Sequence, residues 1–292
     1  MKIILNSLYI AFTMSTIAFG QELFVGKDAV VSNVVIHRPG EPSLIRKTDT
    51  ELFRKSDIAV LRALRYFTKT QNNDGSWGDK SAQTLATPLV LLSFLGRGEH
   101  TGSKEFGESV SRARTWVLNS SPTGVAERLA SIVSLYEYSC MVYSSSHPEQ
   151  KTNEFAKIES LLATMPDPQN DIWVDFAAYF SLPYYTSRPQ WMNRSEDVRK
   201  IYAELPVTEL PMNVDDYLKL YLVSLAKHHR GAKTWYGFNR QTTAALISRQ
   251  QADGSYPVAE GQNGLAAAAL ATLRLEIYSQ FEPISPAVKS KL

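Results

Sequence analysis

Apolar residues recur at helical spacing from about residue 56 onward. The first run has an apolar residue at every third position and one more beside them: Ile58, Leu61, Leu64, Phe67 and Val60. This spacing places the apolar side chains on one face and predicts a helix with one buried side. Ser56 or Asp57 is expected to cap its first turn, because their side-chain oxygens accept hydrogen bonds from unpaired amides.

The same spacing predicts further helices along the rest of the chain, separated by proline or glycine. They fall near residues 84–95, 105–119, 124–143, 152–164, 172–181, 195–204, 214–229, 236–250 and 264–280. Strict alternation of apolar and polar residues, which marks a half-buried strand, is almost absent here. The pattern therefore predicts an all-α fold, with a helical domain over residues 51–282 and a C-terminal tail over residues 283–292.

The segment before the helical domain lacks a sustained period. A short apolar run at residues 30–36 is followed by a stretch at residues 37–42 that contains two prolines and a glycine, which is typical of a turn. We expect residues 21–50 to form an extended leader that packs against the main body.

The first residues of the chain have the pattern of a secretory signal peptide. Lys2 supplies a positive start, residues 8–19 are largely apolar, and Ala18 and Gly20 are the small residues that precede a cleavage site. The apolar run is shorter than the roughly 20 residues that cross a bilayer. We expect residues 1–20 to direct export to the periplasm or the exterior. An uncleaved anchor is the alternative, and the only route to membrane association that the sequence suggests.

One short motif occurs twice, each time between two helices. Residues 71–77 read Gln-Asn-Asn-Asp-Gly-Ser-Trp, and residues 250–256 read Gln-Gln-Ala-Asp-Gly-Ser-Tyr. Asp-Gly predicts a tight turn, because glycine tolerates positive φ and aspartate bonds nearby amides. A repeated helix pair predicts a solenoid or a closed toroid. The residues expected to lock neighbouring hairpins are Gln71, Asp74, Gly75, Trp77, Gln250, Asp253, Gly254 and Tyr256.

These segments resemble the QW repeat of the superfamily of squalene–hopene cyclases, oxidosqualene cyclases and protein prenyltransferases. The first copy carries the pattern at Ala63, Phe67, Gln71, Gly75 and Trp77, whereas the second copy has Tyr256 in place of tryptophan. The resemblance covers residues 56–118 and 214–280, and only the helix spacing is compatible between them. It implies an α/α toroid, with inner and outer rings of helices around an apolar cavity.

The resemblance also implies a candidate proton donor. Cyclases of this type protonate their substrate with an aspartate in an Asp-x-Asp-Asp segment, and the nearest match here is residues 213–216, Asn-Val-Asp-Asp. Asp215 would be the donor and Asp216 its neighbour, although Asn213 replaces the first carboxylate. The same residues also suit the start of a helix, where asparagine and aspartate meet free amides and the positive end of the dipole.

The prenyltransferase resemblance does not extend to a zinc site. Those enzymes use an aspartate, a cysteine and a histidine, and the single cysteine, Cys140, follows Tyr138 where the family has aspartate two positions earlier. His228 and His229 are adjacent, so on a helix they point about 100° apart. We expect no metal and no cofactor, and we expect Cys140 to be a buried, inert thiol.

Two aromatic-rich stretches could line a ligand site or simply fill the core. They contain the three candidate wall residues Trp173, Tyr179 and Trp235. Aromatic faces bind apolar ligands and stabilise cations, but they also pack between helices. The formal net charge is only +2, so the sequence gives no electrostatic case for nucleic-acid binding, which is expected of a clustered basic face.

The leading hypothesis is an exported, squalene-cyclase-like toroid domain whose cyclase chemistry is lost. It would act as a binding or interaction module for an apolar small molecule, a glycan or a protein partner. The alternative is an enzyme, either a small terpene cyclase that uses Asp215 or a toroid lyase or hydrolase with another acidic pair. A scaffold with a filled centre and no ligand is a third possibility.

Overall fold

The computed structural model describes residues 47–142, 152–165, 171–179, 189–207 and 211–277. Every regular element in these residues is a helix, which confirms the all-α prediction. The helices are α2 (Lys47–Thr70), α3 (Gln83–Gly96), α4 (Gly107–Asn119), α5 (Val125–Val142), α6 (Asn153–Ala163), α7 (Ile172–Tyr179), α9 (Pro189–Glu204), α10 (Val214–Arg230), α11 (Ala232–Arg249) and α12 (Gly264–Glu276). The predicted signal peptide, residues 1–20, most of the leader and the tail lie outside the described residues.

The predicted start of the first helix is wrong. Helix α2 begins at Lys47, so neither Ser56 nor Asp57 caps it, and its first turn occupies the last residues of the predicted leader. Ser56 lies inside the helix, where its buried hydroxyl donates a hydrogen bond to the carbonyl oxygen of Leu275 at 3.2 Å. The serine therefore joins two helices instead of starting one.

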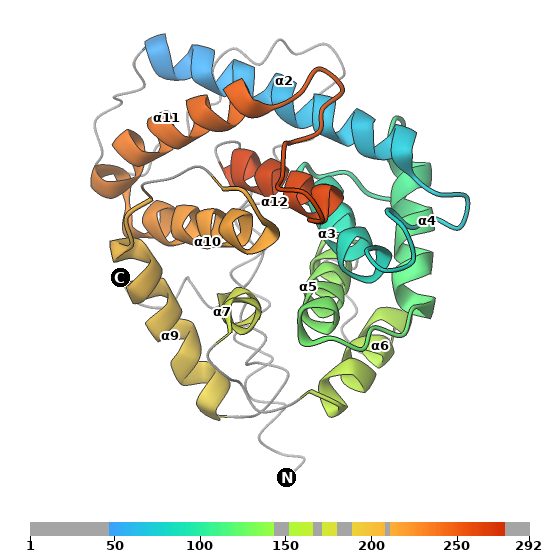
Figure 1. The fold of residues 1–292 in the computed structure, drawn as a ribbon. Helices are drawn as coiled ribbons and strands as arrows, with labels where there is room; N and C mark the ends of the chain where they lie inside the picture. The colour runs from blue at the N-terminus through green and yellow to red at the C-terminus, as the bar shows by residue number, and fades with distance from the viewer. Residues whose placement is uncertain (1–46, 143–151, 166–170, 180–188, 208–210, 278–292) are drawn as a thin grey trace.

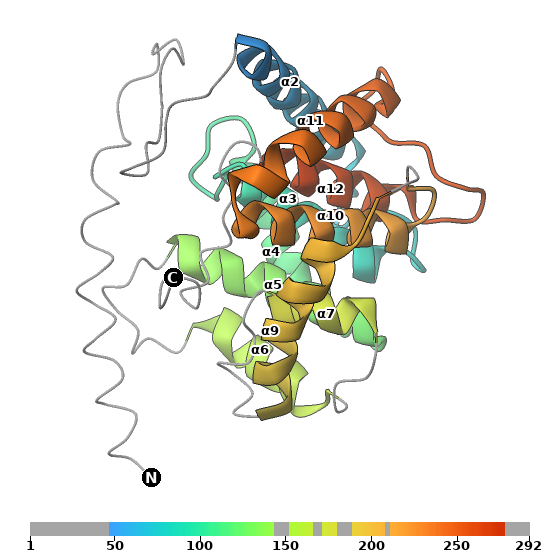
Figure 2. The ribbon, with the colours of Figure 1, turned by 90° about the vertical axis from the view of Figure 1, so that its left-hand side faces the viewer.

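The helices alternate along the chain between an inner and an outer position (Figure 1). The inner helices α3, α5, α7, α10 and α12 pack on one another: α3 contacts α5 and α12, and α10 contacts α12 and α7. Helix α5 also contacts α7. The outer helices lie around them, and α2 and α11, from opposite ends of the described chain, lie side by side in both views (Figure 1 and Figure 2).

The composition of the helices explains which of them are inside. Residues 86–95 of α3 and residues 266–276 of α12 are buried without a break. A helix that is apolar nearly all round cannot leave a face in water, so it occupies the interior. The alanine-rich sequence of α12 lets neighbouring helices approach closely, because interaxial distance depends on side-chain size at the contact. By contrast, α2 keeps one exposed polar face.

The repeated turns connect neighbouring outer helices by matching bonds. Gln71 donates from its side-chain amide to the carbonyl oxygens of Gly75 and of Ser109 on α4, both at 3.0 Å. Gln250 donates in the same way to Gly254, at 3.2 Å, and to Ala59 on α2, at 2.8 Å. Each turn therefore clamps the end of one outer helix to another outer helix.

The two turns also share their internal bonds. Asp74 accepts from the amide and hydroxyl of Ser76, and Asp253 accepts from the same groups of Ser255. The aromatic residues differ. Trp77 donates its indole hydrogen to the carbonyl oxygen of Phe67 at 2.6 Å, whereas the buried Tyr256 hydroxyl has no hydrogen-bond partner among the described residues. We call the turn at residues 71–77 the first clamp and the turn at residues 250–256 the second clamp. The second clamp thus lacks one hydrogen bond that the first clamp has.

Replacing the glycine of the second clamp should destabilise the fold more than replacing a similar glycine elsewhere. Gly254 has φ 104°, and a Cβ there would lie 2.5 Å from the carbonyl oxygen of Arg62. Gly261 has φ 77°, and a Cβ there would have nothing within 4 Å. Gly261→Ala should cost about 1 kcal/mol for the positive φ alone. Gly254→Ala should cost about 1–3 kcal/mol more for the clash, as measured by urea unfolding. Equal costs would contradict the clamp contact.

Candidate functional site

The acidic segment at residues 213–216 forms the start of α10. The side chain of Asn213 accepts a hydrogen bond from the amide of Asp216 at 2.8 Å. The carboxylate of Asp216 in turn accepts from the amide of Met212 at 3.2 Å. This reciprocal pair satisfies two free amides and resembles a capping box. Asn213 and Asp216 therefore serve as the N-terminal cap of α10.

Asp215, the predicted proton donor, lies at the surface. Its residue is exposed, and its carboxylate accepts a hydrogen bond from the indole nitrogen of Trp173 on α7 at 3.2 Å. The structure thus brings together two residues that the sequence suggested separately, one as an acid and one as a ligand wall. The Asp215 residue is therefore accessible to water and is tied to a neighbouring helix.

The three predicted wall residues fall into two groups at opposite ends of α10. Trp173 lies beside Asp215 near the helix start, whereas Tyr179 and Trp235 lie near its end. The Tyr179 hydroxyl is hydrogen-bonded to Nδ1 of His229, and the Trp235 ring lies 5.0 Å from the His228 ring. All three aromatic residues are buried. They do not form one wall, because each ring packs against a different neighbour.

A buried cation that the sequence analysis did not single out lies behind Trp235. Arg274 on α12 is fully buried, and its guanidinium donates to the hydroxyls of Thr242 and Thr243 on α11. Its central carbon lies 5.6 Å from the centre of the Trp235 ring. Burial lowers the pKa of Arg274 to about 9. A charged residue inside the run Ala-Leu-Ala-Thr-Leu-Arg-Leu-Glu was the signal available in the sequence.

A buried acid lies on the same helix, two residues away. Glu276 is fully buried, and its carboxyl lies so close to Gly96 of α3 that a Cβ at that glycine would stand 2.1 Å from an oxygen. Burial raises the pKa of Glu276 well above its usual value, although the positive charge of Arg97 opposes this shift. Burial also raises the pKa of Tyr221 on α10, and the nearby acids Glu276 and Glu137 raise it further.

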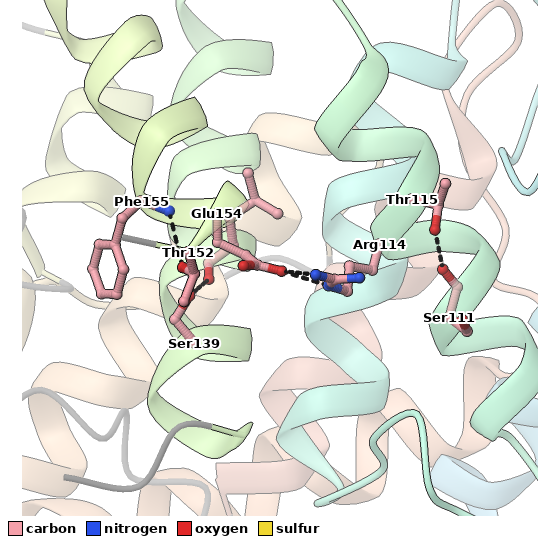
Figure 3. Close-up of polar contacts among 8 residues, drawn as sticks. Ser111, Arg114, Thr115, Ser139, Thr152, Glu154 and Phe155 are labelled. Atoms are coloured by element: carbon pink, nitrogen blue, oxygen red, sulfur yellow. Dashed lines mark hydrogen bonds and ion pairs between the residues drawn. The ribbon is translucent and has the colours of Figure 1, made fainter. Parts of the chain in front are cut away.

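A buried ion pair joins the outer helices α4 and α6 (Figure 3). Arg114 contacts the carboxylate of Glu154, whose side chain is fully buried, and the same guanidinium lies over the ring of Tyr138 at 5.0 Å. Thr152 caps α6 by accepting a hydrogen bond from the amide of Phe155 at 3.4 Å. These contacts fix neighbouring hairpins and have the character of a structural link.

Two grooves lie at the surface beside Tyr66, which lines both. One has a volume of about 440 Å³ and runs along α2, with Asp253 of the second clamp among its lining residues. The other, of about 370 Å³, lies between residues 78–82 and residues 255–265. Both grooves therefore border the place where the second clamp meets α2.

The remaining sequence predictions concern metals, the thiol and membrane spans. The described residues contain no group of three or more histidine, cysteine, aspartate or glutamate side chains placed to hold a metal ion. Cys140 is partly buried, and burial, with a smaller effect of Glu137, raises the pKa of its thiol to about 12. Among the described helices, none combines the length and apolar character needed to cross a bilayer.

Comparison of the chain with models of protein families, with curated proteins and with solved structures gives no match.

Changing Glu276 to glutamine should alter how stability depends on pH. Below about pH 4 the carboxyl is protonated in both the folded and the unfolded wild type. As the pH rises, the unfolded carboxyl ionises while the folded one stays neutral. The wild type should therefore lose up to about 1.4 kcal/mol per pH unit relative to Glu276→Gln, until the folded pKa is reached.

Urea unfolding followed by circular dichroism between pH 4 and pH 8 measures this difference. Glu159→Gln, at an exposed position on α6, is the matched control for the loss of one acidic side chain. A stability difference between wild type and Glu276→Gln that stays constant over this pH range would contradict the buried neutral carboxyl.

Proposed function

We propose that this chain is an exported α/α toroid of the squalene-cyclase type that acts as an interaction module and carries out no cyclase chemistry. The alternation of inner and outer helices supports the toroid, since each inner helix packs on two other inner helices. The clamp from Gln250 to Ala59 supports closure, because it joins the last described hairpin to the first described helix.

One observation carries the proposed loss of cyclase chemistry. The acids at the start of α10 are exposed, and Asp216 is engaged as a helix cap. In a cyclase, the acid that protonates the apolar substrate needs to lie beside it in a pocket that contains little water. The described side chains of the inner helices are largely buried, among them Tyr221 and Glu276.

A partner would therefore meet the outside of the proposed toroid. The two surface grooves beside Tyr66 provide concave sites there, with volumes in the lower part of the range of ligand sites. Apolar and polar side chains line both. An interaction module of this kind needs a rigid frame and an accessible groove, and it does not need a reactive group.

Turnover assays test the proposed lack of chemistry. Purified wild type and Asp215→Asn should both leave squalene and prenyl diphosphates unchanged, as measured by mass spectrometry of the extracted lipids. Asparagine keeps an oxygen that can accept the Trp173 hydrogen bond, so the variant should fold as the wild type does. Product made by wild type and abolished in Asp215→Asn would overturn the proposal.

The proposed export leads to a second prediction, which concerns cleavage of the signal peptide. When the full chain is expressed in a bacterium with a secretory pathway, we expect cleavage after Gly20, because small residues occupy the required positions. Mass spectrometry of the purified protein should then find a mature N-terminus at Gln21. An intact N-terminus on protein recovered from the membrane fraction would favour the uncleaved anchor instead.

A further inference from the structure

The groove along α2 is lined by a regular stripe of that helix. Its lining residues recur three or four positions apart: Ile58, Leu61, Arg62, Arg65, Tyr66, Lys69 and Thr70. The opposite face of α2, which includes Ala63 and Phe67, is buried in the core. Helix α2 therefore has two organised faces. One packs inside the fold, and the other, with the spacing of a helix-packing surface, is turned to solvent.

The apolar part of this stripe is accessible. Ile58 is 42% exposed and lies at one end of the groove. Leu61 and Tyr66 are partly buried, and Asp253 of the second clamp lines the same groove. When an apolar partner binds, these side chains would bury apolar area now exposed to water, which favours binding.

The charged part of the stripe is positive and partly unpaired. Arg65 forms an exposed ion pair with Glu105 at 2.8 Å. Arg62 and Lys69 form no ion pair within the described part of the chain. They lie seven positions apart, which places them about two turns apart on the same side of α2. Asp253 is the single acid lining the groove.

We propose that this groove binds an amphipathic helix of a protein partner, with apolar residues at helical spacing flanked by acidic residues. The inference rests on the proposed function, because it names the partner of that module. Residues 58–70 extend for about 18 Å, so about twelve residues of a helix lying along α2 would be in contact. The apolar stripe would bind its apolar face, and Arg62 and Lys69 would pair with its acids.

The charge pattern distinguishes this partner from two other occupants. A second copy of the chain that docked α2 against α2 would place Arg62 and Lys69 near their own counterparts, which is unfavourable. The part of the chain's own leader that precedes α2, residues 21–46, has three acids, Glu22, Asp28 and Glu41, balanced by Lys27, Arg38 and Arg46. Neither a second copy docked in this way nor the chain's own leader has the net negative charge that would complement the positive groove.

A designed peptide tests the inference directly. The probe is a labelled twelve- to sixteen-residue helical peptide with leucine at the i, i+3, i+4 and i+7 positions and glutamate at the flanking positions. The control peptide has lysine in place of every glutamate. Fluorescence anisotropy at low salt should show binding of the acidic peptide to the purified chain and much weaker binding of the basic one.

Matched variants locate the site. Lys69→Glu should weaken binding of the acidic peptide by about threefold to tenfold, whereas Lys219→Glu, at an exposed position on α10, should not. Ile58→Asp should weaken it by about tenfold, whereas Ile201→Asp, at an isoleucine on α9 that is 51% exposed, should not. Circular dichroism shows that each variant is folded.

The outcomes separate this inference from the proposed function. Equal binding of both peptides, no binding at millimolar peptide, or no effect of Lys69→Glu would overturn the acidic-helix partner and leave the module standing. A dimer in sedimentation that Ile58→Asp abolishes, or tighter binding of a peptide of residues 21–46, would also overturn it. Turnover of squalene or a prenyl diphosphate that requires Asp215 would overturn the module itself.

Discussion

The contact between Gln250 and the carbonyl oxygen of Ala59 is the interaction on which the rest of the structure depends. It joins residues that are far apart in the sequence, from α11 and α2, and Gly254 makes close backbone contact beside it. Without it, α2 would contact α12 and α11 through side-chain packing and the hydrogen bond from Ser56 to Leu275. Bringing together segments so far apart in the chain costs loop-closure entropy, and this contact helps to offset that cost.

The buried charges of α12 follow from the number of helices that pack around it. Helix α12 is surrounded by α2, α3, α10 and α11, so every side of it is covered, including the positions of Arg274 and Glu276. Arg274 is tolerated because two threonine hydroxyls and an aromatic face replace water around it. Glu276 is tolerated because a carboxyl can remain neutral. Neither residue needs a catalytic role to explain its position.

The sequence predicted the existence of the helices well, because their apolar spacing is strong, but it predicted some helix starts poorly. Helix α9 begins at Pro189, where proline presets the first turn, and α2 begins at Lys47 within a polar segment that has no apolar period. The clamp residues were predictable from their repetition. Their partners Ser109 and Ala59 were not, because a single sequence carries no signal for which distant backbone carbonyl a glutamine meets.

The groove along α2 depends on closure as well. Its floor is α2, but Asp253 lines it only because the second clamp holds that turn against residues 59–62. The apolar face of α2, which includes Ala63 and Phe67, lies in the core, so the stripe from Ile58 to Lys69 faces outward. The same turn that joins α11 to α2 therefore also shapes a concave, positively charged surface. Binding at that surface would favour the closed arrangement, because a partner that contacts both α2 and the turn binds only when they are held together.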